Sequence, residues 1–246
     1  MLRSMSDAPP RFGPADAVLL SDEDAAAQLL QATIKGLWEV VNQLTRLRRS
    51  KRSNYRVSIF GSARIQQGTP AYERVARLAA ELARMGCDIV TGGGPGLMQA
   101  ANEGAASAHA EHPERSVGIR ITLPFEQHVN PFVGDAYEHQ TFFSRLHHFA
   151  LLSDAFVVVP GGIGTLLEMA MAWQLLQVRQ LHNVPLILVG QMWPELIAWA
   201  RKAMLREEFG LASPLDFEIP QCTSDVDDTV ALIRASREAW LAAQGG

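Results

Sequence analysis

From Tyr55 onward, short apolar segments alternate with longer stretches of helical periodicity, and this alternation restricts the fold more than any other feature. The apolar runs have the length of buried strands, and each is followed by enough residues for a helix. The expected strands are Arg56–Phe60, Asp88–Val90, Ser116–Ile121, Ala155–Val159 and Pro185–Val189. The expected helices lie near residues 70–85, 95–110, 141–152, 164–178, 193–207 and 225–242. This order predicts an α/β fold with a doubly wound, mostly parallel sheet and helices on both faces.

The first 52 residues do not follow this pattern. Residues 1–20 are expected to form a flexible tail. Ser21 and Asp24 have the spacing of a capping box. Apolar residues then recur at spacings of four and three, at Leu30, Ile34, Leu37, Val41 and Leu44. We therefore expect an N-terminal amphipathic helix over residues 21–52, followed by one α/β domain over residues 53–246.

Composition excludes several classes of protein. The chain has 246 residues, of which 48% are hydrophobic, which suffices for one sizeable core. The formal net charge of -4 disfavours nucleic acid as a partner. The two cysteines, Cys87 and Cys222, do not form a CxxC motif, so neither a disulfide framework nor a zinc ribbon is expected. The polar start does not resemble a signal peptide and no apolar run is long enough to span a membrane, so we expect a cytoplasmic protein.

Two glycine-rich segments stand where an expected strand passes into an expected helix. The first contains Gly92, Gly93, Gly94 and Gly96, and the second runs from Pro160 through Gly161, Gly162, Gly164 and Thr165 to Glu168. Such turns can serve tight packing alone. However, free amides and the helix dipole also make them anion sites. Because strands of an open α/β sheet present their carboxyl ends at one edge, the two loops predict one phosphate-bearing ligand between them.

Other cofactor signatures are missing from both loops. The sixth position of the dinucleotide fingerprint is Leu97 in the first loop and Leu167 in the second, where glycine or alanine is needed, so NAD is not expected. No Gly-Lys-Ser/Thr sequence occurs, which excludes a Walker A loop. His147 and His148 point about 100° apart on a helix, so no metal site is expected.

Taken together, these loops resemble the Lonely Guy family of cytokinin-activating phosphoribohydrolases, whose members often carry a lysine decarboxylase label. The resemblance covers roughly residues 55–240. Its most specific part is the PGGxGTxxE signature at Pro160–Glu168. Four further segments carry it: Phe60–Arg64, Gly92–Met98, Leu123–Gln127 and Phe142–Arg145.

The resemblance implies a Rossmann-like nucleotide-binding catalytic domain, a homodimer, and hydrolysis of AMP or N6-substituted AMP without metal or organic cofactor. The family's catalytic pair falls on Arg145 and Glu168. Leu146 and Leu167 depart from the family, which commonly has lysine and a second acid at these positions. The expected substrate-binding residues are Gly61, Ser62, Arg64, Gly93, Gly94, Gly96, Met98, Glu126, Gly161, Gly162, Gly164 and Thr165.

The chemistry of Arg145 and Glu168 suits cleavage of an N-glycosidic bond. The ribose becomes oxocarbenium-like in this reaction, and a carboxylate can stabilise that charge and orient the attacking water. Glu168 lies near the positive end of its expected helix, which favours the ionised carboxylate. Arg145 could grip phosphate or ribose oxygens and keep Glu168 charged.

Two other functions compete with the hydrolase. The first is a non-catalytic nucleotide binder or a carrier of the molybdenum-cofactor type on the same scaffold. The second is the decarboxylase of the family label, which needs a lysine to form a Schiff base with pyridoxal phosphate. The chain has only Lys35, Lys51 and Lys202, and none lies near a glycine loop, so decarboxylation is not expected.

Overall fold

The computed structural model describes residues 23–28, 30–31, 53–121, 129–206, 208 and 210–244. The chain divides into two units, residues 1–50 and 51–246. The described part of the first unit, residues 23–28 and 30–31, is helical. The expected tail and the remainder of the expected helix over residues 21–52 lie outside the described residues.

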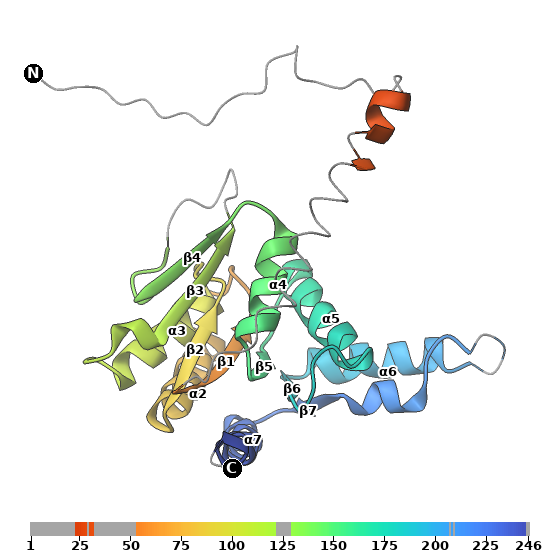
Figure 1. The fold of residues 1–246 in the computed structure, drawn as a ribbon. Coiled ribbons are helices and arrows are strands. Elements are labelled where there is room, and N and C mark those ends of the chain that lie inside the picture. Colours follow the sequence, from red (N-terminus) through yellow and green to blue (C-terminus); the bar gives the residue numbers. More distant parts are fainter. Residues whose placement is uncertain are drawn as a thin grey trace, which may run out of the picture. The chain divides into compact units, whose positions relative to one another are not determined.

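The second unit is built on a seven-stranded sheet with the order β4-β3-β2-β1-β5-β6-β7 (Figure 1). Every pair of neighbouring strands is parallel. The strands are β1 (Tyr55–Phe60), β2 (Cys87–Thr91), β3 (Ser116–Ile121), β4 (Asp135–His139), β5 (Ala155–Val158), β6 (Leu186–Val189) and β7 (Pro220–Thr223). The chain therefore winds outward from β1 in both directions, which confirms the expected Rossmann-like, doubly wound fold.

Helices cover both faces of the sheet. They are α2 (Pro70–Arg84), α3 (Leu97–Ala108), α4 (Phe142–Leu152), α5 (Ile163–Gln177), α6 (Met192–Met204) and α7 (Val226–Gln244), with short 3₁₀ helices at Pro113–Arg115 and Pro214–Glu218. Alternate residues of the buried strands face opposite layers. In β5, Val157 packs with α2, α3 and α7, whereas Phe156 and Val158 pack with α4, α5 and α6. The near-continuous apolar strands of the sequence are thus explained by burial on both faces.

This winding fixes where a ligand can bind. After β4 the chain returns past β1 to form β5, so the connections leave β1 and β5 in opposite directions. In open α/β sheets, ligands occupy the crevice outside the carboxyl ends of the strands at such a switch point. The segments after β1 and β5, Gly61–Arg64 and Gly161–Thr165, lie at this position.

The two edge strands, β4 and β7, were not predicted from the sequence. β4 has the sequence Asp-Ala-Tyr-Glu-His and is mostly exposed, while β7 begins with Pro220. Neither has the run of apolar residues that marks a buried strand. Their position at the edges explains this composition, because an edge strand needs no continuous apolar face and tolerates proline.

Helix α5 keeps part of its apolar surface exposed. Met169 and Ala172 are buried, but Ile163 is 82% exposed and Leu167 is 45% exposed. None of the described helices is long and apolar enough to cross a membrane. The exposed Ile163 and Leu167 suit the homodimer that the family resemblance implies, and we predict that a second copy of the chain covers this apolar surface. Light scattering at micromolar concentration should give at least the mass of a dimer, and a monomeric mass would contradict the prediction.

Candidate active site

A cavity of about 500 Å³ opens at the carboxyl edge of the sheet, near the switch point. Six segments line it: the loop after β1, the ends of β2 and β3, and the N-terminal turns of α3, α4 and α5. The lining residues are Gly61, Ser62, Ala63, Arg64, Gly92, Met98, Arg120, Ile121, Phe142, Arg145, Gly162, Ile163, Gly164, Thr165 and Glu168. The volume is within the range of small-molecule sites, about 300–1,000 Å³.

Arg145 is held in a fixed orientation in the wall of this cavity. It lies on the first turn of α4, whose N-terminus is capped by the side chain of Thr141. Its Nε donates to the carbonyl oxygen of Ile119 in β3 at 2.9 Å, and its guanidinium carbon lies 5.2 Å from the centre of the Phe149 ring. The residue is only 8% exposed. These contacts leave Nη1 to pair with Glu168 and place Nη2 against Gly92, and both of these residues line the cavity.

Glu168 forms an ion pair with Arg145. The Arg145 Nη1 to Glu168 Oε1 distance is 2.9 Å, and Glu168 is 7% exposed on the second turn of α5. Burial raises the pKa of the Glu168 carboxyl, and the charge and hydrogen bond of Arg145 oppose that rise. The pair therefore combines a carboxylate in a dry environment with the cation that favours its ionised form.

The second glycine loop presents unpaired backbone amides at the cavity. Gly162, Ile163, Gly164 and Thr165 all line it. The amides of Ile163, Gly164 and Thr165 have no hydrogen-bond acceptor among the described residues, as expected for the first turn of a helix. Gly161 does not line the cavity. A Cβ at that position would lie 2.7 Å from Thr165 Cγ2, so the glycine allows Thr165 to pack closely against the loop.

The first glycine loop contributes less to the cavity than expected. Its lining residues are Gly92 and Met98, whereas Gly93, Gly94 and Gly96 lie outside the lining. The Gly93 amide already donates to Thr91 Oγ1 at 2.9 Å, and the Leu97 amide donates to the Ser62 carbonyl at 2.8 Å. A Cβ on Gly92 would overlap the Arg145 guanidinium. The loop thus provides close packing for the site.

A buried network of polar side chains beneath the first glycine loop was not predicted from the sequence. Asn102 Oδ1 accepts from Thr91 Oγ1 at 2.6 Å and from Asn130 Nδ2 at 3.0 Å. Asn130 Nδ2 also donates to the Gly94 carbonyl at 3.0 Å. These side chains satisfy one another and the loop backbone, so they hold the loop in one conformation.

The loop after β1 joins the two glycine loops. The Ser62 amide donates to the Pro160 carbonyl at 3.1 Å, while the Ser62 hydroxyl accepts from the Arg64 amide at 3.1 Å. The Arg64 side chain lines the cavity and is exposed. Gly61 lines the cavity as well, and a Cβ there would lie 2.5 Å from Val159 Cγ2.

Two cavity residues, Arg120 and Phe142, have side chains suited to ligand binding that the motifs of the sequence did not indicate. Neither belongs to a glycine loop or to the catalytic pair. Position alone distinguishes them, since each stands directly at a strand end or a helix start. Glu126, which was expected to bind substrate, lies outside the described residues.

The histidines of α4 do not converge on the cavity. His148 Nδ1 lies 2.9 Å from Nε2 of His139 in β4. His147 is partly buried, which lowers its pKa. Within the described ranges, no group of three or more His, Cys, Asp or Glu side chains could hold a metal ion.

Comparison with known proteins identifies the family to which the chain belongs. Residues 98–233 match the family described as "Possible lysine decarboxylase". A pyrimidine/purine nucleotide 5'-monophosphate nucleosidase of Escherichia coli K12 is 29% identical over 140 residues, which is 54% of this chain and 30% of that protein. The chain therefore spans less than a third of the length of this curated relative.

Solved structures support the fold. A molybdenum cofactor carrier protein from Chlamydomonas reinhardtii aligns with a TM-score of 0.56 at 20% identity, covering 75% of this chain and 99% of the other. The molybdenum cofactor binding protein of Rippkaea orientalis aligns with a TM-score of 0.55 at 23% identity, covering 76% and 98%. At these identities the likeness concerns the fold. Since the family match spans more than half of the sequence, the chain belongs to the possible lysine decarboxylase family, which is the Lonely Guy family that its glycine loops resemble.

Proposed function

We propose that this protein hydrolyses the N-glycosidic bond of nucleoside 5'-monophosphates and releases the free base and ribose 5-phosphate. The observation that carries the proposal is the buried ion pair of Arg145 and Glu168 in the wall of the cavity. AMP and N6-substituted AMP, such as a cytokinin riboside 5'-monophosphate, are the substrates implied by the family resemblance.

Glu168 has the surroundings of a carboxylate that stabilises positive charge. As the C1'–N bond breaks, its electron pair leaves with the base and the ribose becomes positively charged. A carboxylate in a water-poor site stabilises that charge more strongly than one in bulk water. Water then attacks C1', and its proton is taken up by Glu168 or by the departing base. The ion pair with Arg145 opposes the rise in pKa that burial causes at Glu168, and it orients the carboxylate for this step.

The first turn of α5 is the proposed site of the 5'-phosphate. The amides of Ile163, Gly164 and Thr165 have no acceptor within the described part of the chain, and all three residues line the cavity. Unpaired amides and the helix dipole favour an anion. The phosphate would then lie beside the Arg145–Glu168 pair, because Glu168 is on the second turn of the same helix.

The relatives support this function and also supply its alternative. The Escherichia coli relative is named as a nucleosidase of nucleotide 5'-monophosphates, although it aligns over only part of its length. The alternative is a non-catalytic carrier, as the structural neighbours that bind molybdenum cofactor are titled. The buried Arg145–Glu168 pair supplies the negative charge that cleavage of an N-glycosidic bond needs, so the pair favours the hydrolase.

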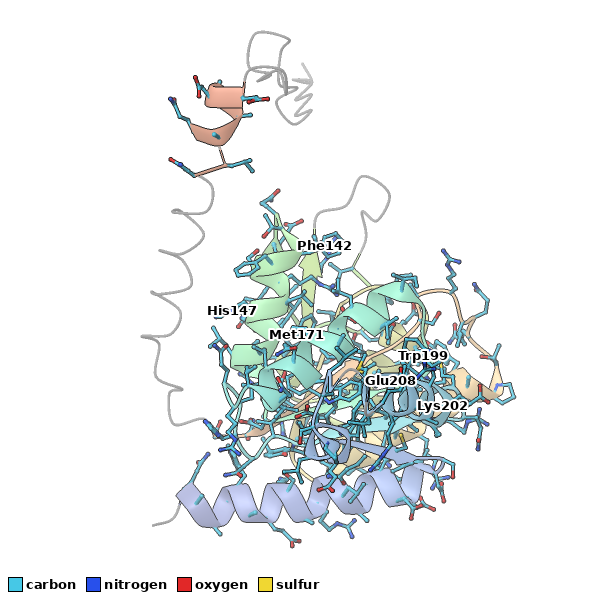
Figure 2. The ribbon with its side chains drawn as sticks, turned by 90° about the vertical axis from the view of Figure 1, so that its right-hand side faces the viewer. Phe142, His147, Met171, Trp199, Lys202 and Glu208 are labelled. Atoms are coloured by element: carbon cyan, nitrogen blue, oxygen red, sulfur yellow. The ribbon has the colours of Figure 1, made fainter. Side chains whose placement is uncertain are left out.

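Decarboxylation, which the family description mentions, has less support. Among the described residues, no lysine lines the cavity. Lys202 lies on α6, away from Phe142 at the start of α4 (Figure 2). Lys35 and Lys51 are outside the described residues. A pyridoxal phosphate enzyme needs a lysine beside the bound cofactor.

The proposal predicts that the 5'-phosphate is required for turnover. The protein should release base far faster from AMP or IMP than from adenosine or inosine. The α5 amides stabilise a bound anion and contribute little to the binding of a neutral ligand. Base release can be followed by chromatography for each nucleotide and its nucleoside. Equal rates with and without the phosphate would contradict the proposed site. Binding of nucleotides with no release of base would favour the carrier.

A further inference from the structure

The two ends of the cavity differ in chemistry. The end at β5 and α5 carries the backbone amides of Ile163–Thr165. The opposite end, at β3 and α4, is lined by Arg120, Ile121 and Phe142. In the sheet, β2 and β1 separate β3 from β5, so these two ends are about 14 Å apart at the backbone. A nucleoside monophosphate spans a comparable length from phosphate to base.

Arg120 brings a cation to the end at β3. It is the fifth residue of β3, and its aliphatic stem packs on the first glycine loop, where a Cβ on Gly93 would lie 3.2 Å from Arg120 Cγ. Glu138 is its neighbour across the register with β4. No ion pair joins Arg120 to a carboxylate in the described part of the chain. Its guanidinium is therefore available to a ligand.

Phe142 and Ile121 add an apolar wall to the same end. Phe142 is the first residue of α4 and is 49% exposed, although it lines the cavity. Ile121 is the last residue of β3 and is 8% exposed. Figure 2 shows Phe142 at the N-terminal end of α4, far from α7. An exposed aromatic face beside an aliphatic side chain is a surface on which a nucleic-acid base can stack.

The Arg145–Glu168 pair lies between these ends, since it joins α4 to α5. If the phosphate occupies the first turn of α5, the scissile bond falls near the pair and the base extends toward β3. The base would then meet the Phe142 ring and the Arg120 guanidinium.

We propose that Arg120 selects nucleotides whose base presents carbonyl and ring-nitrogen acceptors, as in the 6-oxopurines, over nucleotides with a 6-amino group. A guanidinium has only donors, and its fork matches O6 and N7 of a 6-oxopurine. The 6-amino group of AMP presents a donor in place of O6, which leaves one arm of the fork without an acceptor. The same hydrogen bonds would stabilise negative charge on the departing base. This inference rests on the proposed function.

IMP and AMP test the inference as a matched pair, because both are purine nucleotides with the same phosphate and ribose and differ at the 6-position and N1. The wild-type protein should show kcat/KM for IMP about 10- to 100-fold above that for AMP. Arg120→Gln should reverse this preference, because an amide can donate to N7 or accept from a 6-amino group. Arg201→Gln, on the exposed surface of α6, is the matched control and should keep the wild-type ratio.

A second variant separates reading of the base from stacking. Phe142→Leu keeps an apolar side chain but loses the ring, so it should weaken IMP and AMP about equally, by roughly 5- to 100-fold, and preserve their ratio. Melting curves of each variant show whether it is folded. If Arg120→Gln fails to fold, Arg120→Lys removes the fork while keeping the charge and should narrow the IMP preference.

Calorimetric titration of IMP and AMP makes the outcome independent of catalysis. Tighter binding of IMP by the wild-type protein and of AMP by Arg120→Gln would support the base-reading role of Arg120. If neither protein released base, the same result would overturn the proposed hydrolysis. Equal affinities of the wild-type protein for IMP and AMP would overturn the inference. The Arg120→Gln variant should still bind IMP more tightly than inosine. Equal affinities of this variant for IMP and inosine would also overturn the inference, because Arg120 would then bind the phosphate.

Discussion

Glu168→Gln is expected to lower the rate of base release by about 10²–10³-fold and to leave nucleotide affinity largely unchanged. The substitution removes the negative charge but retains an oxygen that can accept from Arg145 Nη1. Positive charge on the ribose develops only in the transition state, so its loss of stabilisation appears in kcat rather than in binding. Base release and calorimetric titration of the same preparation separate the two quantities.

Glu195→Gln is the matched control for this substitution. Glu195 is exposed on the first turn of α6 and does not line the cavity, so the control should turn over at the wild-type rate. A melting curve identifies variants that have lost the fold. A folded Glu168→Gln protein that releases base at the wild-type rate would show that Glu168 only complements the α5 dipole, and the carrier function would then be favoured.

Gly96→Ala should destabilise the protein by about 3–5 kcal/mol. Gly96 has φ 72° and ψ -133°, a conformation that costs other residues about 1–3 kcal/mol. In addition, the new Cβ would overlap the Ser62 carbonyl and lie 2.6 Å from the Ala63 carbonyl carbon. Overpacking of this kind typically costs about 1–3 kcal/mol. Because Ser62 and Ala63 line the cavity, nucleotide affinity should fall as well.

Gly68→Ala separates the two contributions. Gly68 also has a positive φ, 80°, but a Cβ there would meet nothing within 4 Å. This control should therefore cost only about 1–2 kcal/mol for the left-handed backbone. Thermal unfolding of both variants measures the difference, with a melting temperature lowered by about 6–20 °C expected for Gly96→Ala. Equal losses for the two glycines would contradict the close approach of the loops.

The sequence predicted those strands that are covered by helices on both faces of the sheet. The five expected strands are all present within one residue at each end, because their apolar runs reflect burial between two helical layers. β4 and β7 could not be predicted in this way. All residues of β4 and all but Pro220 of β7 are at least partly exposed, so nothing in Asp135–His139 or Pro220–Thr223 distinguishes a strand from a loop. Only pairing with β3 and β6 makes them strands.

For the site, motifs predicted which residues gather but not what each backbone group does. Glycine content alone cannot tell a ligand-facing amide from one that is already bonded. The amide of Gly93 donates to Thr91, while that of Gly164 has no acceptor among the described residues. Arg120 and Phe142 belong to no glycine loop, and they reach the cavity only because β3 and α4 end and begin at the same edge of the sheet.

The polar edge strands have a consequence for how copies of this protein associate. An exposed strand edge is a template on which another chain can add a strand, and unprotected edges lead to open-ended aggregates. Here β4 carries Asp135 and Glu138, and β7 is four residues long and starts with a proline that lacks an amide donor. Continuation of the sheet into a neighbouring molecule is therefore disfavoured at both sides. Self-association would proceed through helical surfaces such as that of α5, and a self-complementary contact there closes into a dimer without fibrous growth.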